Sequence, residues 1–104
     1  MTALDEYVTD VLMRDLVGHD RRPVAFLVYL WLFAEEERRR GPVSASYQEL
    51  AESIGVSRSS VQTAVSWLIR RKLLVANKKS ATAVLKLSVL RPWRPSTRRA
   101  PASI

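Results

Sequence analysis

The 104-residue chain contains no cysteine, which excludes disulfide bonds and thiolate metal sites and favours a reducing, cytoplasmic location. His19 is its only histidine, and it lies in the polar sequence GHDRRP, where we expect a solvated turn residue. No motif pairs a nucleophile with a base. We therefore expect a protein that is not an enzyme and that binds no metal and no cofactor.

Long apolar runs are also missing. The longest, VAFLVYLWLFA, covers the 11 residues 24–34, whereas a helix that spans a bilayer needs about 20. The first ten residues, MTALDEYVTD, carry acids where a signal peptide would carry positive charge. We expect no membrane segment and no leader, and we interpret the run as a buried helix.

Acidic residues are absent from the second half of the chain. Residues 1–52 contain ten acids and six arginines, a net charge of −4, whereas residues 53–104 contain eleven basic residues and no acid. A segment with charge of one sign is typical of proteins that bind polyanions. The asymmetry favours nucleic acid as a partner.

Two helices are predicted in the first half. Apolar residues at three- and four-residue steps predict a helix over 4–17 that ends before Gly18. A second helix is expected to start near Pro23, with Asp20 able to cap it, and to end at Gly41 and Pro42. Its last turns, EEERRR, suit exposed ion pairs.

A second pair of helices is joined by a very short turn. Ser46 and Glu49 form a capping-box pattern before a helix over 47–54, Gly55 can adopt the left-handed conformation that ends it, and Ser57 can cap the next helix, 58–72. The expected buried face of this last helix is Val61, Ala64, Val65 and Leu68.

After Lys72 the sequence becomes rich in β-forming residues. Residues 73–77 and 82–90 flank the polar KKSA and predict a β-hairpin, while residues 42–46 form a connector or a short edge strand. The expected fold class is mainly α with a small β-hairpin. We divide the chain into an N-terminal helix (1–18, a possible dimerisation element), a central domain (19–90) and a flexible basic Pro/Arg-rich tail (91–104).

The pattern LAxxxGVSxxxV has the requirements of a helix-turn-helix. Ala51 is small enough for the next helix to cross closely, Gly55 makes the turn, and Val56 and Val61 fix the crossing angle. The second helix then projects a polar face that fits a major groove about 12 Å wide. A basic hairpin after these helices is the order of a winged helix.

Residues 44–90, in particular YQELAESIGVSRSSVQTAVSWLIRRKLLV, resemble the winged helix-turn-helix DNA-binding domains of bacterial transcription regulators, most closely the GntR type with MarR-like relatives. The resemblance implies a winged helix-turn-helix, here with an extra N-terminal helix. It implies sequence-specific binding of double-stranded DNA by a homodimer. No effector-binding domain follows, so no small-molecule effector is expected.

The resemblance also implies which residues bind DNA. Bases would be contacted by Arg58 and Gln62, and the wing would place Lys78 and Lys79 on the backbone. The phosphate contacts implied by position are Gln48, Ser57, Ser59 and Ser60. Thr63 and Ser66 lie on the same exposed face of the helix and complete the expected interface.

Two other functions are compatible with the sequence. Plasmid or phage replication and partition proteins also use winged helices, although such proteins usually carry a second domain. A winged helix can instead serve as a protein-interaction module, but the outer face of 58–70 would then tend to be apolar or acidic. Here it is Arg, Ser, Gln and Thr, which favours nucleic acid.

Overall fold

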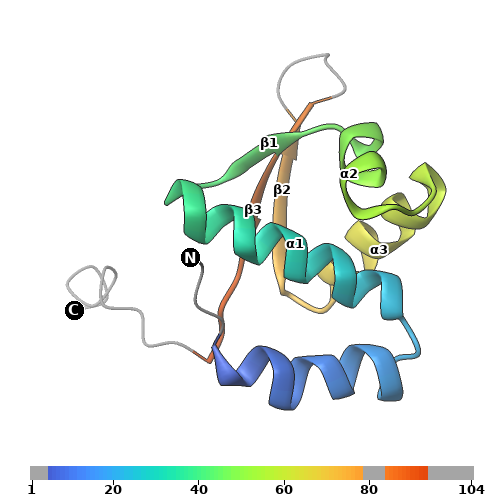
Figure 1. The fold of residues 1–104 in the computed structure, drawn as a ribbon, viewed down its shortest axis with the longest axis vertical. Coiled ribbons are helices and arrows are strands. Elements are labelled where there is room, and N and C mark those ends of the chain that lie inside the picture. Colours follow the sequence, from blue (N-terminus) through green and yellow to red (C-terminus); the bar gives the residue numbers. More distant parts are fainter. Residues whose placement is uncertain (1–4, 79–83, 94–104) are drawn as a thin grey trace.

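The computed structural model describes residues 5–78 and 84–93 of the chain. It is mainly helical, with a small three-stranded antiparallel sheet. Figure 1 shows α1 crossing the centre of the fold, between the N-terminal helix and the remaining elements. In chain order the elements are η1 (Val8–Leu12), η2 (Arg14–His19), α1 (Pro23–Arg39), β1 (Val43–Ala45), α2 (Tyr47–Ile54), α3 (Arg58–Arg70), β2 (Leu74–Lys78) and β3 (Leu85–Val89).

The N-terminal helix is wound more widely than an α-helix. Both η1 and η2 are π-helical, with hydrogen bonds that span five residues, as from the Asp20 amide to the Asp15 carbonyl (2.7 Å). Val8, Leu12 and Leu16, four positions apart, are buried against the rest of the fold. Part of the apolar face of this helix, on which the dimerisation prediction depends, is thus covered within the same chain, whereas Tyr7 stays 36% exposed.

Helix α1 is the central element of the core. It begins at Pro23, as expected, but ends at Arg39 because Arg40 already has the left-handed conformation, with φ of 60°. Its N-cap is Arg22 without a side-chain cap, so the expectation that Asp20 caps this helix was wrong. No helix within residues 5–78 and 84–93 is long and apolar enough to cross a membrane.

The sheet contains the expected hairpin and one further strand. Its order is β1-β3-β2, with β3 antiparallel to both neighbours. Residues 43–45 therefore form the edge strand that the sequence left as an alternative to a connector. Leu85, Leu87 and Val89 alternate toward the core, and the hairpin loop 79–83 lies outside the described residues.

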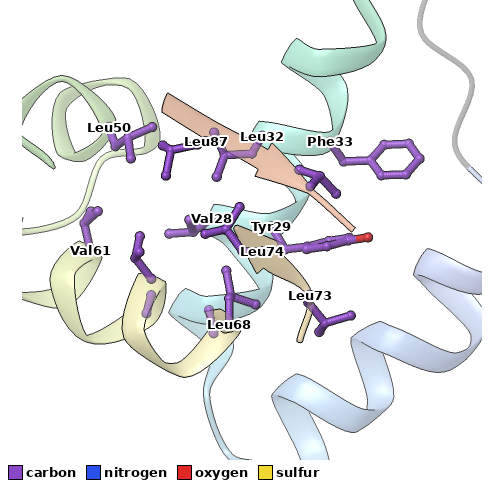
Figure 2. Packing of buried hydrophobic residues seen from close by; sticks show 14 of the residues in the cluster. Val28, Tyr29, Leu32, Phe33, Leu50, Val61, Leu68, Leu73, Leu74 and Leu87 are labelled. Carbon is purple, nitrogen blue, oxygen red and sulfur yellow. The ribbon is translucent and has the colours of Figure 1, made fainter. Parts of the chain in front are cut away.

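The core joins all of these elements around α1. Figure 2 shows Val28, Tyr29, Leu32 and Phe33 of α1 among side chains from the other helices and the sheet. The Tyr29 hydroxyl donates to the Leu90 carbonyl (2.8 Å), so this ring also holds the end of β3. Contributions from the other elements include Leu50, Val61, Leu68, Leu74 and Leu87, all 0–2% exposed. The relative positions of α2, α3 and the sheet are fixed by this one cluster.

The C-terminal segment is packed for three residues beyond its expected boundary. We expected a flexible tail from residue 91, but Arg91 forms ion pairs with Glu36 and Glu37. Trp93 stacks on Tyr7, with ring centroids 4.6 Å apart. These contacts extend the folded part to Trp93 because two acids of α1 and an aromatic ring of the N-terminal helix were available as partners. Residues 94–104 lie outside the described residues.

Candidate nucleic-acid interface

Helix α2 and the turn that follows it have the predicted local structure. Ser46 Oγ accepts a hydrogen bond from the Glu49 amide (3.1 Å), and the Glu49 carboxylate accepts one from the Ser46 amide (2.9 Å). Gly55 ends the helix with φ of 90°, a backbone conformation that costs other residues more. Val56 is half-buried against the core, and Ala51 is buried. The turn therefore leads directly into α3.

Helix α3 starts at its predicted cap. Ser57 Oγ accepts from the Ser60 amide (3.1 Å) and donates to Ser60 Oγ (2.8 Å). Both serines, expected to contact phosphates, thus already have hydrogen bonds that form the helix start. The helix ends at Arg70 rather than at residue 72, because Lys72 has a left-handed backbone with φ of 60°.

The two faces of α3 differ in chemistry. The apolar face that was predicted to be buried, Val61, Ala64, Val65 and Leu68, is 0–3% exposed. The opposite face is exposed and mainly polar, with Ile69 (43% exposed) as its apolar member: its polar residues are Arg58, Ser59, Gln62, Thr63, Ser66 and Arg70. Ser60 is half-buried. The structure thus brings most of the expected DNA-binding residues together on one rigid helix.

The remaining expected contact residues come from other elements. Gln48 is exposed on the first turn of α2, where its Nε2 donates to the Glu52 carboxylate (3.0 Å). Lys78 is the last residue of β2, opposite Leu85 of β3, at the loop end of the hairpin. Lys79 lies outside the described residues.

Four arginines at this side of the molecule lack an internal counter-ion. Within the described ranges 5–78 and 84–93, no ion pair is formed by Arg21, Arg22, Arg58 or Arg70. Arg58 and Arg70 stand at the two ends of α3, and Arg21 and Arg22 directly precede α1. Their charges are available to an external anion.

Two hollows lie beside α3. The first, about 300 Å³, lies between the start of α1 and the first turns of α3 and is lined by Arg21, Arg22, residues 23–25, Ser59, Ser60, Thr63 and Ala64. The second, about 280 Å³, is lined by Arg22, Gln62, Thr63, Ser66, Trp67 and Arg70. Arg22 and Thr63 belong to both hollows. We call the pair the α1–α3 trough.

Trp67 lines the second hollow of the α1–α3 trough and contacts two of its arginines. The Arg22 guanidinium lies over its ring, 4.5 Å from the centroid, and that of Arg70 lies 5.6 Å away. Both distances fit cation–π contacts. The indole Nε1 donates to Asp20 Oδ2 (3.0 Å). Trp67 thereby connects the loop before α1 to the exposed face of α3.

Asp20 holds this connection in place. Its carboxylate, 6% exposed, also pairs with Arg71 Nε (3.1 Å) and with His19 Nδ1 (3.0 Å). Burial acts to raise the pKa of Asp20, but hydrogen bonds from His19 and Trp67 and the charge of Arg71 outweigh it, so the pKa is lowered. Asp20 is therefore ionised and cancels the charge of Arg71. His19 itself is exposed, as expected.

Sequence reasoning missed the contribution of the loop before α1. Arg21 and Arg22 were visible only as part of a polar turn, and Trp67 was not among the expected site residues. The one available signal in the sequence was the pair of adjacent arginines, which has no neighbouring acid other than Asp20. Their position beside α3 follows from the packing of α1 against α3, which the sequence pattern does not specify.

No protein-family model, curated protein or solved structure matches this chain. Among the residues that the structure describes, no three or more histidine, aspartate or glutamate side chains are grouped to hold a metal ion. The arrangement offers fixed cations and hydroxyls to a ligand.

Proposed function

We propose that this protein is a sequence-specific double-stranded DNA-binding protein of the winged helix-turn-helix type and acts as a transcriptional regulator. In this proposal α2 and α3 form the helix-turn-helix, α3 enters the major groove, and the β2–β3 hairpin is the wing. The observation that carries it is the exposed face of α3. That face combines arginine, glutamine and hydroxyl side chains on a helix whose other face is fully buried.

The chemistry of this face suits base edges. Arg58 is exposed in the first turn of α3 and free of ion pairs within the described residues, and a guanidinium can bind guanine O6 and N7 together. Gln62, one turn later, is exposed as well and can bind adenine N6 and N7. Both side chains project from a helix that its buried residues hold rigidly, which favours discrimination between sequences.

Charge supports the same proposal. The eleven basic residues of 53–104 are not balanced by any acid in that segment. Non-specific affinity for DNA comes mainly from such cations, because they release counter-ions from the phosphates. Lys78 and Lys79, at the loop end of the hairpin, would add contacts to the backbone next to the groove.

A homodimer is part of the proposal, since helix-turn-helix proteins commonly read two half-sites about one helical turn apart. Val8, Leu12 and Leu16 are already used within the chain. The apolar side chains still exposed on the N-terminal helix include Met13 (42%) and Val17 (39%). Sedimentation at tens of micromolar measures the state: a monomer both alone and on DNA rules the dimer out.

Selection of binding sites from random DNA duplexes tests the proposal as a whole. We expect enrichment of a defined sequence, with two related half-sites if the protein binds as a dimer. Recovery of duplexes without any common sequence would rule out base readout, and no retention of duplex at low salt would rule out DNA binding. Random single-stranded RNA, offered in parallel, is the control and should not be enriched.

A further inference from the structure

We propose that the α1–α3 trough is a second phosphate-binding site, which holds the DNA backbone on the flank of α3 through Arg21 and Arg22. This inference rests on the proposed function and adds to it a contact element outside the helix pair and the hairpin. The occupant is the phosphodiester backbone of the same duplex that α3 enters. Four observations, of groove geometry, charge, backbone conformation and side-chain support, carry it.

The geometry of a helix in a major groove requires contacts on two sides. An α-helix with its side chains is about 10–12 Å wide, and the major groove is about 12 Å wide, so a phosphate backbone runs close to each flank. The first hollow of the α1–α3 trough, about 300 Å³, lies between the start of α1 and the flank of α3, whereas the second, about 280 Å³, is lined in part by Gln62 and Ser66 of the outer face. One backbone strand has room to lie there.

The charge in the trough matches phosphate. Arg21 and Arg22 line its first hollow, Arg22 and Arg70 line its second, and none of the three has an ion pair within the described residues. Ser59 and Thr63 add hydroxyl side chains to the lining of the first hollow. Asp20, the acid of this loop, is neutralised by Arg71 (3.1 Å). The trough therefore presents net positive charge together with hydrogen-bond donors.

The backbone of the loop is held in a costly conformation. Arg21 has φ of 57°, in the left-handed region where residues other than glycine and asparagine are uncommon. Hydrogen bonds from the Asp20 amide to the Asp15 carbonyl and from the Arg22 amide to the Leu16 carbonyl, both 2.7 Å, fix it. Strained residues cluster at functional sites. The conformation of Arg21, which lines a basic hollow, therefore supports binding of a ligand by its side chain.

Arg22 is held in position by a series of side-chain contacts that starts at Trp67. Its guanidinium lies over the Trp67 ring (4.5 Å), and the Trp67 indole donates to Asp20 (3.0 Å), which in turn pairs with Arg71. A cation stacked in this way keeps its N–H groups free at the edge while its position is restricted. Trp67 is thus a positioning residue for Arg22.

The test compares two double variants that remove the same charge. Arg21→Asn, Arg22→Ala removes the trough arginines while asparagine keeps the left-handed backbone accessible. Arg14→Ala, Arg40→Asn is the matched control, since Arg14 and Arg40 are exposed on other elements and Arg40 also has positive φ. Affinities of the full chain for its selected duplex and for a random duplex are measured by fluorescence anisotropy at several salt concentrations.

We expect the trough variant to weaken both duplexes alike. Two lost phosphate contacts lower the slope of log affinity against log salt by about 1.8, so that between 50 and 200 mM salt its affinity falls about 12-fold less than that of the wild type. The control variant should keep the wild-type slope. Arg21→Lys, Arg22→Lys should keep it as well, because point charges suffice for phosphates.

Trp67→Leu provides the readout for positioning. It removes the ring under Arg22 but no charge, so the salt slope should stay near that of the wild type while the affinity for both duplexes falls. A wild-type slope for the trough variant, with Arg58→Ala still losing sequence preference, would overturn the inference and leave the proposed function standing. A wild-type chain that binds no duplex would overturn both.

Discussion

The two ends of α1 carry arginines in opposite electrostatic settings. At its end, Arg38 and Arg39 pair with Glu35 of the same helix, and Arg91 pairs with Glu36 and Glu37. At its start, Arg21 and Arg22 have no ion pair within the described residues and lie beside α3. Both ends carry arginines, but the three glutamates 35–37 lie only near the end of the helix and supply the ion-pair partners there.

This difference separates structural arginines from those available to a ligand. Net charge alone does not identify a binding surface, because every arginine counts equally in it. Arg91 is 15% exposed and serves the fold, whereas Arg58 is exposed and without a counter-ion among the described residues. Substitutions among the paired residues at the end of α1 should therefore change the stability of the fold, whereas substitutions of the unpaired arginines should change the affinity for DNA.

The largest effect is expected from removing an acid at the paired end. Glu36 accepts hydrogen bonds from the Val89 amide (2.8 Å) and from Arg91 (2.7 Å). Glu36→Ala leaves the half-buried Arg91 guanidinium with Glu37 as its remaining ion-pair partner among the described residues and should lower the free energy of unfolding by about 3 kcal/mol, measured by urea denaturation. Arg38→Ala, in which the lost side chain is 66% exposed, is the control and should cost less than about 1 kcal/mol. Equal losses of unfolding free energy in the two variants would contradict the structural role that we assign to the pair of Glu36 and Arg91.

Removal of an arginine from the unpaired set should act on DNA and leave stability unchanged. Arg58→Ala should weaken binding to the selected duplex by about 1–3 kcal/mol relative to random duplex, because a bidentate contact to one base is lost. Competition titrations with both duplexes measure the ratio. Arg14→Ala, an exposed arginine of the N-terminal helix, is the control; equal losses on both duplexes for Arg58→Ala would remove this residue from base readout.

The hairpin lysines that we propose as phosphate contacts should show the opposite pattern. Lys78→Ala, Lys79→Ala is expected to weaken selected and random duplexes alike and to reduce the salt slope by about 1.8, since each lysine would neutralise one phosphate in the proposed complex. The measurement is the same salt series, with Lys86→Ala on the exposed side of β3 as the control. An unchanged salt slope for the double variant would show that Lys78 and Lys79 do not contact the DNA backbone.

The smallest effect is expected from releasing a paired arginine next to the interface. Asp20→Asn removes the partner of Arg71 and should lower the free energy of unfolding at pH 7 by about 1 kcal/mol. Because the pKa of Asp20 is lowered in the folded protein, its contribution is present above the unfolded-state pKa and is lost as pH falls through the folded pKa. The difference between wild type and variant should therefore shrink below about pH 4, as denaturation at several pH values measures. A difference that stays constant down to pH 2 would exclude this linkage.

Local chemistry explains which parts of the fold the sequence predicted. Ser46 with Glu49, Gly55 and Ser57 act within a few residues of their own positions, so the bounds of α2 and the start of α3 agree with the structure. The buried face of α3 followed from its periodicity. The same reasoning placed Arg58 and Gln62 on the exposed side, where the structure has them.

Contacts between distant residues explain the parts that were missed. Trp67 reaches Asp20 across 47 positions, and Arg91 reaches Glu36 across 55. Local patterns give no information on such pairs, so Asp20 was assigned to a helix cap and Arg91 to a flexible tail. The basic loop beside α3 was missed for the same reason, because its place depends on how α1 packs against α3.

The contact between Trp93 and the N-terminal helix closes the described chain into a ring. The Trp93 indole donates to Asp5 Oδ2 (2.7 Å) across 88 positions, and its ring stacks on Tyr7. Contacts between such distant positions are entropically costly to form early in folding. This clasp should accordingly form late and open first, so that amide hydrogens of residues 6–19 and the last β3 residues exchange with solvent together. A donor and an acceptor dye attached at the exposed Glu6 and Pro92, each next to a residue of this contact, would report opening of the clasp by loss of energy transfer.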